Sequence, residues 1–360
     1  MARTLADALN PEANSFNLVR LLAALAVIVS HGFLVPFGYG AKEPLQDLTA
    51  LTLGQHAVNI FFVISGATLA RSLSNNPNLT QYAVARLLRI VPALIGFGLV
   101  FAFLIGPVFT SASVSVYFSD ANTWLYPMLV GLQFQHAAPP PGVFETVPIP
   151  GAVNNPLWTI KYEVFAYLAL GMVAFIGALN RRWIITSALV LFVVLTQLLQ
   201  PSEESSSLGP LFQAAKFGTC FLLGVTAYLM RSHIPISAGW LVASIAIAVV
   251  LSFSPFALFG YLLVDAHLTF VVGAAYFGVP TEWTRRNDIS YGVYIYGWPI
   301  QQSIIALFPG IGAFAAGSLS ILLAVTIGYL SWWLIESPVL SFKHRALGWL
   351  AQLRINRRVA

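Results

Sequence analysis

Long apolar runs separated by short polar connections dominate the 360-residue chain. A helix needs about 20 predominantly apolar residues to cross a bilayer, and ten runs reach or approach that length. They cover residues 16–36, 51–72, 87–109, 157–178, 184–200, 211–231, 238–254, 257–279, 289–308 and 312–335. The pattern predicts an all-α fold, a polytopic membrane bundle of about ten transmembrane helices.

The composition supports a membrane protein. The chain is 58% hydrophobic and only 9% charged, whereas soluble domains carry about 25% charged residues. The N-terminal stretch "MARTLADALNPEAN" lacks the pattern of a cleaved signal peptide, so we expect the first helix to be retained. The single cysteine, Cys220, excludes an intrachain disulfide and a cysteine-based metal cluster.

The basic residues indicate the orientation of the chain. When the connections are assigned alternately to two sides, 15 of the 18 Lys and Arg residues fall on one side, and only Lys42, Lys161 and Lys216 fall on the other. This asymmetry predicts that both termini of a multi-pass membrane protein are cytoplasmic. It explains the net charge of +5 without a nucleic-acid partner. We expect residues 1–345 to form the membrane domain and residues 346–360 to form a basic cytoplasmic tail against lipid.

One outer connection is unusually long. Residues 110–156 contain no Lys or Arg and end in a run rich in Pro and Gly, for which we expect no regular structure. Within this loop, "NTWLYPMLVGLQFQ" is apolar but too short to span, which predicts a re-entrant or interfacial segment.

Two ionisable residues interrupt the first apolar run. Arg20 and His31 are eleven residues apart, which on a helix is three turns plus about 20° and a separation of ~16 Å along the axis. Both therefore project from one face. Arg20 lies near the helix start, where the helix dipole disfavours a cation unless an anion is close. The alternative is that Arg20 is an interfacial anchor and His31 a buried core histidine; the shared face favours a functional pair.

A carboxylate is predicted at the depth of His31. Glu163, in "NNPLWTIKYEVFAYL", lies about six residues into a helix that runs inward from the outer surface. His31 lies about five residues from the outer end of its own helix. Equal depth would allow a carboxylate to orient an imidazole for proton transfer. The alternatives for Glu163 are a local pair with Lys161 or a place among lipid headgroups.

Three arginines are expected near inner helix starts. Arg86 and Arg89, in "ARLLRIVP", are spaced i and i+3 in what the pattern predicts to be a first helical turn. Together with Arg20 they could cradle a phosphate. The alternative is ordinary positive-inside charge, which position alone favours.

Two of three further ionisable residues, Asp265 and His267, are interpreted as structural or as supporting the residues of a site from behind. Asp265 and His267 lie at membrane depth, but an i, i+2 pair points to different helix faces. His56 is expected at an outer helix end, facing water.

Six stretches carry a family resemblance in order along the chain. They are "RLLAALAVIVSH", "VNIFFVISGATLA", "RLLRIVPAL", "NPLWTIKYEVFAYL", "ISYGVYIYGWPIQQ" and "WWLIESPVL". This ordered set resembles the acyltransferase-3 family of membrane O-acyltransferases, whose first helix has arginine, ten residues and histidine. In two places the chain departs from the family pattern: Gly297 stands where many members have histidine, and Ala67 replaces a bulky residue after Ser65-Gly66. The resemblance stops short of the esterase-like domain that some members add, so it implies acylation without such a domain in the same chain.

The resemblance implies transfer of an acyl group, most simply acetyl, from cytoplasmic acyl-CoA to a hydroxyl of a glycan or lipid-linked saccharide. His31 would be the general base and Glu163 its orienting partner. An acyl-histidine intermediate stays open. Acyl-CoA would be a co-substrate, with no tightly bound cofactor and no metal. The residues expected to bind the donor are Arg20, Arg86, Arg89, Ser65, Asn59, Tyr291 and Tyr294, and the residue expected to contact the acceptor is Trp158.

Two rival functions remain at this stage. Intramembrane Arg, His and Glu also mark the substrate or proton paths of transporters and flippases. No inverted internal repeat is visible, which counts against a carrier. The second and weaker rival is a non-catalytic partner subunit.

Overall fold

The computed structural model describes residues 4–9, 14–134, 136–200 and 208–342. The predicted basic tail, residues 346–360, lies outside these residues. In the described chain every regular element is helical, which agrees with the all-α prediction. The helices of regular α geometry are α1 Leu5–Ala8, α2 Phe16–Leu34, α3 Gln46–Thr49, α4 Leu53–Asn75, α5 Leu79–Val100, α6 Gly106–Phe109, α7 Val114–Ser119, α8 Ala121–Gln133, α9 Ile160–Phe175, α10 Arg182–Leu198, α11 Gly209–Leu229, α12 Ala238–Leu251, α13 Ala257–Ala274, α14 Val279–Arg286, α15 Ser290–Leu307, α16 Ala313–Ser331 and α17 Ser337–Ser341. A 3-10 turn, η2 Asn155–Thr159, precedes α9, and two π-helical turns, η1 Phe101–Ile105 and η4 Trp332–Glu336, follow α5 and α16.

Each of the ten predicted runs coincides with a helix. Within the part of the chain that the structure describes, six helical segments are long and apolar enough to cross a membrane: Phe16–Leu34, Leu53–Asn75, Leu79–Phe109, Asn155–Phe175, Ala257–Ala274 and Ala313–Ser341. The other four runs correspond to α10, α11, α12 and α15, of which α10 and α12 are shorter than 18 residues. The membrane character is therefore supported, and the count of ten spans with both termini inside stays a prediction.

The chain divides into two compact units. The first is drawn from residues 1–30, 43–77 and 165–290, and the second from residues 31–42, 78–164 and 291–360. The chain passes from one unit to the other within α2 and within α9.

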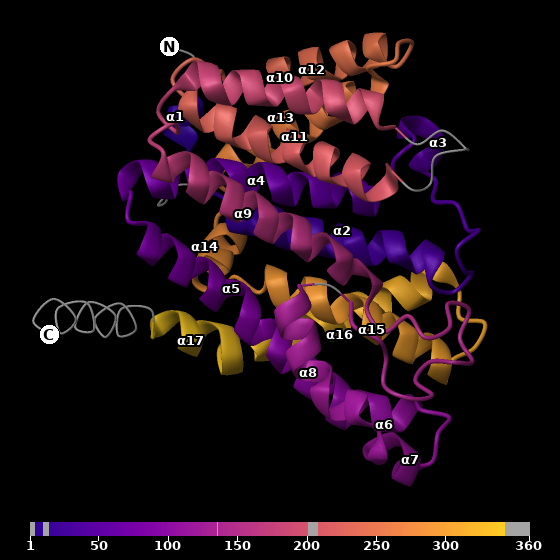
Figure 1. The fold of residues 1–360 in the computed structure, drawn as a ribbon. Helices are drawn as coiled ribbons and strands as arrows, with labels where there is room; N and C mark the ends of the chain where they lie inside the picture. The colour runs from indigo at the N-terminus through magenta and orange to yellow at the C-terminus, as the bar shows by residue number, and fades with distance from the viewer. Residues whose placement is uncertain (1–3, 10–13, 135, 201–207, 343–360) are drawn as a thin grey trace, which may run out of the picture. The chain divides into compact units, whose positions relative to one another are not determined.

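In the first unit, α4 and α11 pack closely, α10 lies along α11, and α13 contacts both α4 and α12 (Figure 1). Gly66 of α4 faces the backbone of Phe221, and Gly224 of α11 faces the backbone of Val63. A Cβ at either glycine would overlap the opposing backbone, so only glycine permits this approach. The same packing buries Lys216, the eighth residue of α11, to 1% exposure. The third lysine assigned to the outer side therefore lies inside this unit.

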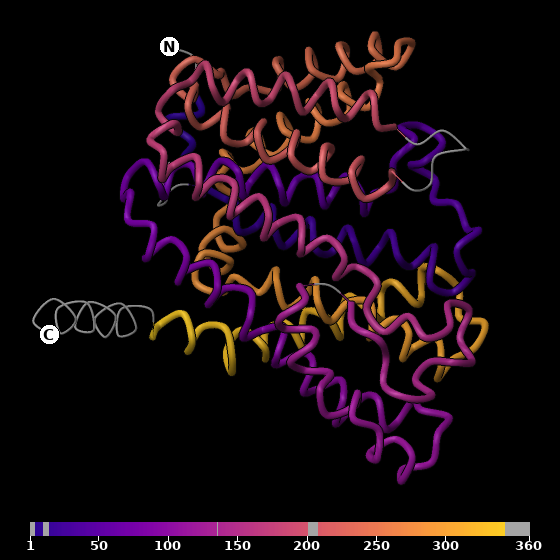
Figure 2. Tube along the Cα trace, viewed as in Figure 1, coloured from indigo at the N-terminus to yellow at the C-terminus, as the bar shows by residue number. Residues whose placement is uncertain are grey.

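In the second unit, α5 continues through η1 into α6 (Figure 2). The 13-residue α8 packs on α5, with Gly98 against Pro127 and Gly131 against Ile95. Its other side exposes Trp124, Leu125 and further apolar side chains. The segment expected to be re-entrant or interfacial is thus a short helix, and its place in the membrane stays a prediction.

The helix that carries the paired arginines begins earlier than the apolar pattern indicates. The Asn78 side chain accepts a 3.0 Å hydrogen bond from the Gln81 N–H and caps α5 there. Arg86 and Arg89 are consequently the eighth and eleventh residues of α5, and their predicted place in its first turn is wrong. Apolar periodicity missed these turns because they are polar yet still helical.

The predicted sidedness can be tested with two matched serines. Ser115 and Ser74 are both exposed and lie in connections assigned to the outer and inner sides. With the buried Cys220 replaced by alanine, we expect Ser115→Cys to react with an impermeant maleimide added to intact cells. Ser74→Cys should react only after the membrane is opened. Labelling of Ser74→Cys in intact cells would reverse the orientation.

Candidate active site

His31 lies against a tryptophan of the second unit. Its ring meets the ring of Trp298 on α15 edge to face, with centroids 4.9 Å apart and planes at 83°. Trp298 is 1% exposed and belongs to an apolar cluster with Val35, Ile149 and Ile305. The rigid indole limits how the imidazole can turn. His31 itself is half-buried.

A proline explains how α15 holds the long loop that precedes α9. Pro299 has no N–H, so the carbonyl of Ile295, four residues earlier, loses its helical donor. The side-chain amide of Asn154 donates a 2.6 Å hydrogen bond to that carbonyl. This satisfies a polar group that would otherwise be costly to bury.

Two side chains of α15, on the same face as the Ile295 carbonyl, also donate hydrogen bonds to this loop. The Trp298 indole N–H donates to the carbonyl of Ala152 at 2.7 Å. The Gln302 amide donates to the carbonyls of Ile149 and Ala152 at 2.9 and 3.0 Å. Residues 149–154, the end of the Pro- and Gly-rich loop, are thereby fixed beside the tryptophan that contacts His31.

The start of α9 is joined to the same helix. Tyr294 of α15 shares a 2.7 Å hydrogen bond with the Thr159 hydroxyl, and its own hydroxyl also donates to the Pro156 carbonyl at 3.0 Å. Glu163 is one turn after Thr159, and Trp298 is one turn after Tyr294. Tyr294, which binds the start of α9, and Trp298, which contacts His31, are therefore one turn of α15 apart, about 6 Å along the axis. The direct pairing of His31 with Glu163 stays a prediction.

Arg89 forms a largely buried ion pair. Its guanidinium donates to Glu336 of η4 at 3.3 Å, and the two side chains are 16% and 2% exposed. The guanidinium also lies 5.7 Å from the ring centre of Tyr291 and 5.9 Å from that of Trp332. Two predicted donor residues, Arg89 and Tyr291, are thus in contact. A phosphate would compete with Glu336 for Arg89.

Arg20 has the nearby anion that its place in the helix requires. It is the fifth residue of α2, and its guanidinium lies 3.7 Å from the Asp288 carboxylate within the first unit. Asp288 also accepts a 2.6 Å hydrogen bond from Ser290 at the start of α15. With side-chain exposures of 21% and 13%, the pair is accessible from the surface.

A buried carboxylate beside the end of α2 was not found from the sequence. Glu43, 6% exposed, accepts hydrogen bonds from the Ser30 hydroxyl and from the Leu53 N–H, the latter at 2.5 Å. Ser30 directly precedes His31, and Leu53 begins α4. Glu43 therefore holds the chain before His31 to the start of α4. Its separation of 13 residues from Ser30, through an irregular connection, follows no helical period.

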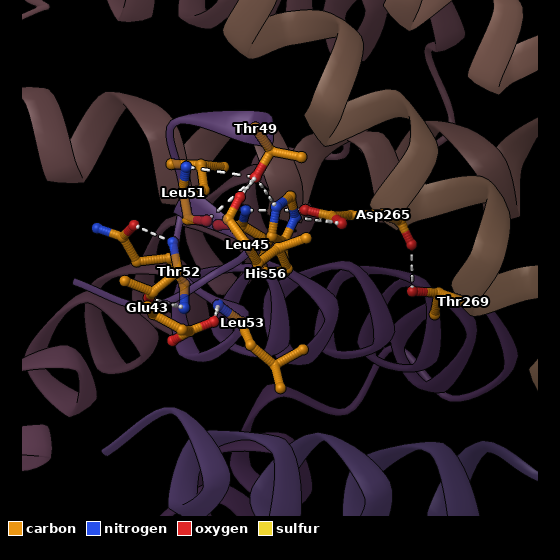
Figure 3. A network of polar contacts seen from close by, with 11 residues as sticks. Glu43, Leu45, Thr49, Leu51, Thr52, Leu53, His56, Asp265 and Thr269 are labelled. Atoms are coloured by element: carbon orange, nitrogen blue, oxygen red, sulfur yellow. Dashed lines mark hydrogen bonds and ion pairs between the residues drawn. The ribbon is translucent and has the colours of Figure 1, made fainter. Parts of the chain in front are cut away.

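His56 does not simply face water, contrary to the expectation. Its side chain is 14% exposed, and Nδ1 lies 2.8 Å from the Asp265 carboxylate (Figure 3). Asn59, a predicted donor residue, donates its amide to the other oxygen of Asp265 at 2.9 Å. Asn59 and Ser65 are both buried on α4.

The remaining predicted residues have other surroundings. Trp158 is half-buried with its ring edge to face against Tyr162, the centroids being 5.7 Å apart. Arg86 lies one turn after Tyr82 on α5. Among the described residues, no three His, Cys, Asp or Glu side chains converge as metal ligands.

Residues 13–336 match the model of the acyltransferase domain family. The chain belongs to the acyltransferase-3 family. It is therefore an acyltransferase, and with its apolar helices an integral membrane protein. This assignment favours an enzyme over the transporter and partner-subunit alternatives.

Two relatives are similar to the chain over nearly their full lengths. An O-acetyl transferase of Shigella phage Sf6 is 28% identical over 343 residues, covering 92% of this chain and 97% of the relative. Nodulation protein 10 of Rhizobium leguminosarum bv. viciae is 27% identical over 374 residues, covering 92% and 94%. No solved structure matches the chain significantly.

Proposed function

We propose that this acyltransferase moves an acetyl group from cytoplasmic acetyl-CoA to a hydroxyl of a glycan or lipid-linked saccharide, in a bacterial inner membrane. The arrangement on α2 carries the proposal: Arg20 and His31 lie on one helix and share one face. The name of the phage relative, an O-acetyl transferase, supports acetyl as the group and oxygen as the acceptor atom.

The dimensions of α2 suit the donor. A CoA thioester has a phosphorylated head and a long, thin arm that ends at the reactive carbonyl. Arg20 would bind the phosphates while the arm runs along α2, and the carbonyl would arrive near His31, ~16 Å away along the axis. Arg86 would add a second cation. Arg89 would take part only by exchanging Glu336 for a phosphate, since its charge is already matched.

His31 would act as the general base. It takes the proton from the acceptor hydroxyl as that oxygen attacks the thioester carbonyl carbon, and the carbon–sulfur bond then breaks. The CoA thiolate leaves and receives the proton from His31. Trp298 holds the imidazole plane, and Glu163 stabilises the imidazolium that forms between the two steps.

The acceptor would reach His31 beneath the outer loop. Residues 149–154 are held to α15 beside Trp298, and Trp158 follows a few residues later. Aromatic side chains at the edge of a loop are suited to packing on sugar rings. Tyr294, held by Thr159 and Pro156, and Tyr291 offer hydroxyls for the donor path.

The function is tested by measuring transfer directly. Purified protein in lipid nanodiscs, supplied with radiolabelled acetyl-CoA and a membrane saccharide fraction, should form a base-labile O-acetyl product. The same saccharides should lose O-acetyl groups in cells that lack the gene. Intact O-acetylation in those cells, together with no transfer in vitro, would refute the proposed donor and acceptor.

The donor role of Arg20 has its own test. Arg20→Lys keeps the positive charge but loses the planar fork that binds phosphate through two hydrogen bonds. Losing one charge-assisted hydrogen bond should weaken acetyl-CoA binding about 10- to 100-fold in calorimetry. Arg286→Lys, at an exposed arginine of α14, is the matched control and should bind normally. Unchanged affinity of Arg20→Lys would make Arg20 an interfacial anchor.

A further inference from the structure

A hydroxyl, an imidazole and a carboxylate form a continuous hydrogen-bonded row in the first unit (Figure 3). The Thr49 hydroxyl oxygen lies 2.9 Å from Nε2 of His56, and Nδ1 of His56 lies 2.8 Å from the Asp265 carboxylate. The three residues come from α3, α4 and α13. The proposed function does not use this row.

The carboxylate is held from two sides. Asn59 donates to the second oxygen of Asp265 at 2.9 Å, and the Thr269 hydroxyl donates to the Asp265 backbone carbonyl at 2.6 Å. Asp265 and Asn59 are 4% and 0% exposed. A buried carboxylate fixed in this way sets the tautomer of the imidazole, with the proton on Nδ1 and the lone pair on Nε2 toward Thr49.

The hydroxyl proton of Thr49 has three acceptors within reach. Nε2 of His56 is nearest at 2.9 Å, and the carbonyls of Leu51 and Leu45 lie at 3.1 and 3.2 Å. A threonine hydroxyl has one proton, so it satisfies one acceptor at a time. Transfer of that proton to Nε2 would create an imidazolium that faces Asp265 directly, which is the charge arrangement needed to activate a nucleophile.

Burial decreases along the row from Asp265 to Thr49. Asp265 is buried, His56 is 14% exposed at its side chain, and Thr49 is half-buried at the end of α3. The next residue, Ala50, adopts a left-handed conformation with φ 56°, which an alanine avoids without a compensating constraint. Thr49 directly precedes this residue, and its hydroxyl lies 2.9 Å from Nε2 of His56.

We propose that Thr49, His56 and Asp265 form a second acyl-handling site, in which Thr49 is a nucleophile that accepts an acyl group. The Thr49 oxygen attacks the carbonyl carbon of an activated acyl ester or thioester while His56 Nε2 takes the hydroxyl proton. The bond from that carbon to the leaving oxygen or sulfur breaks, and the leaving group receives the proton from His56. The product is an O-acyl ester on Thr49, which a second hydroxyl or water releases by the reverse proton movements. The inference rests on the proposed function only for the class of group, an acyl group.

A small activated ester tests this site without CoA. Wild-type protein in nanodiscs, treated with p-nitrophenyl acetate, should release a burst of p-nitrophenolate and carry an acetyl ester on Thr49 in peptide mass spectrometry. Thr49→Val should lose both signals, and Thr49→Ser should keep them. His56→Gln should slow the burst by about 10²–10⁴-fold, and Asp265→Asn should slow it while leaving the other two residues in place.

Thr68 provides the matched control. It is a threonine of α4 whose hydroxyl is directed at the backbone carbonyls of Ile64 and Ser65, at 2.8 and 3.4 Å, and not at an imidazole. Thr68→Val should leave the burst unchanged, and Thr68 should stay unlabelled. Equal labelling of Thr49 and Thr68, or no label on Thr49 in wild-type protein, would overturn the inference. Labelling of Thr49 in protein that does not use acetyl-CoA would refute the proposed donor and leave this inference standing.

Discussion

Replacing His31 with alanine should lower acyl transfer by about 10²–10⁴-fold, the usual contribution of a general base. Expression and acetyl-CoA binding should change little, because the His31 side chain is half-buried and its ring contact is with Trp298. Initial rates with saturating donor, measured on purified protein, give the effect. A His31→Ala variant that transfers acetyl at the wild-type rate would remove His31 from the mechanism.

A double-mutant cycle tests whether Glu163 acts through His31. Glu163→Gln alone should also remove most of the activity. Combined with His31→Ala it should add little, because groups that act as a unit are strongly non-additive. If the two single effects multiply instead, both residues contribute, but Glu163 does not act by orienting or stabilising His31.

Replacing Glu336, a buried carboxylate of the second unit, should lower the free energy of unfolding. Glu336→Gln leaves the guanidinium of Arg89 without the partner that lies 3.3 Å away in a site where Glu336 is 2% exposed. Breaking a buried pair from one side typically costs about 3–5 kcal/mol of unfolding free energy. Unfolding of the detergent-solubilised protein, followed by intrinsic fluorescence, measures the loss.

Two further variants give this prediction its controls. Glu282→Gln removes the carboxylate of an exposed pair, Arg285 to Glu282 at 2.8 Å with exposures of 29% and 42%, and should cost at most about 1 kcal/mol. The double variant Arg89→Met with Glu336→Met replaces both charges with apolar side chains and should recover most of the lost stability. If that stable double variant still binds acetyl-CoA normally, Arg89 has no donor role. If Glu336→Gln unfolds no more easily than Glu282→Gln, the Arg89 pair does not stabilise the fold.

The family relationship and the helices could both be read from the sequence. Within a bilayer each backbone polar group must be satisfied internally, so an apolar run of sufficient length has to be helical. For this reason the ten predicted runs coincide with helices. The helix that carries Arg86 and Arg89 begins at Leu79, eight residues before the predicted start, because Asn78 caps turns that are polar yet helical.

The sequence also determined that Arg20 and His31 share a face, since that follows from the helical period alone. Their partners were decided only by the tertiary structure. Asp288 lies beside Arg20, and Trp298 lies beside His31. A helical period specifies which residues point the same way, but the neighbours they meet depend on how closely the helices approach.

The His56 site shows the physical reason most clearly. His56, Asp265 and Thr49 belong to three helices, and the sequence alone predicted that His56 faces water and that Asp265 is structural or supports a site from behind. The row forms in a unit where α4 also packs against α11 and α13, with glycines at the closest α4–α11 crossing. Hydropathy records how apolar each helix is, and carries no information on which polar side chains meet between them. The sequence therefore determined the helices, the family and the face that Arg20 and His31 share on α2, whereas packing decided which charged and hydroxyl groups lie together.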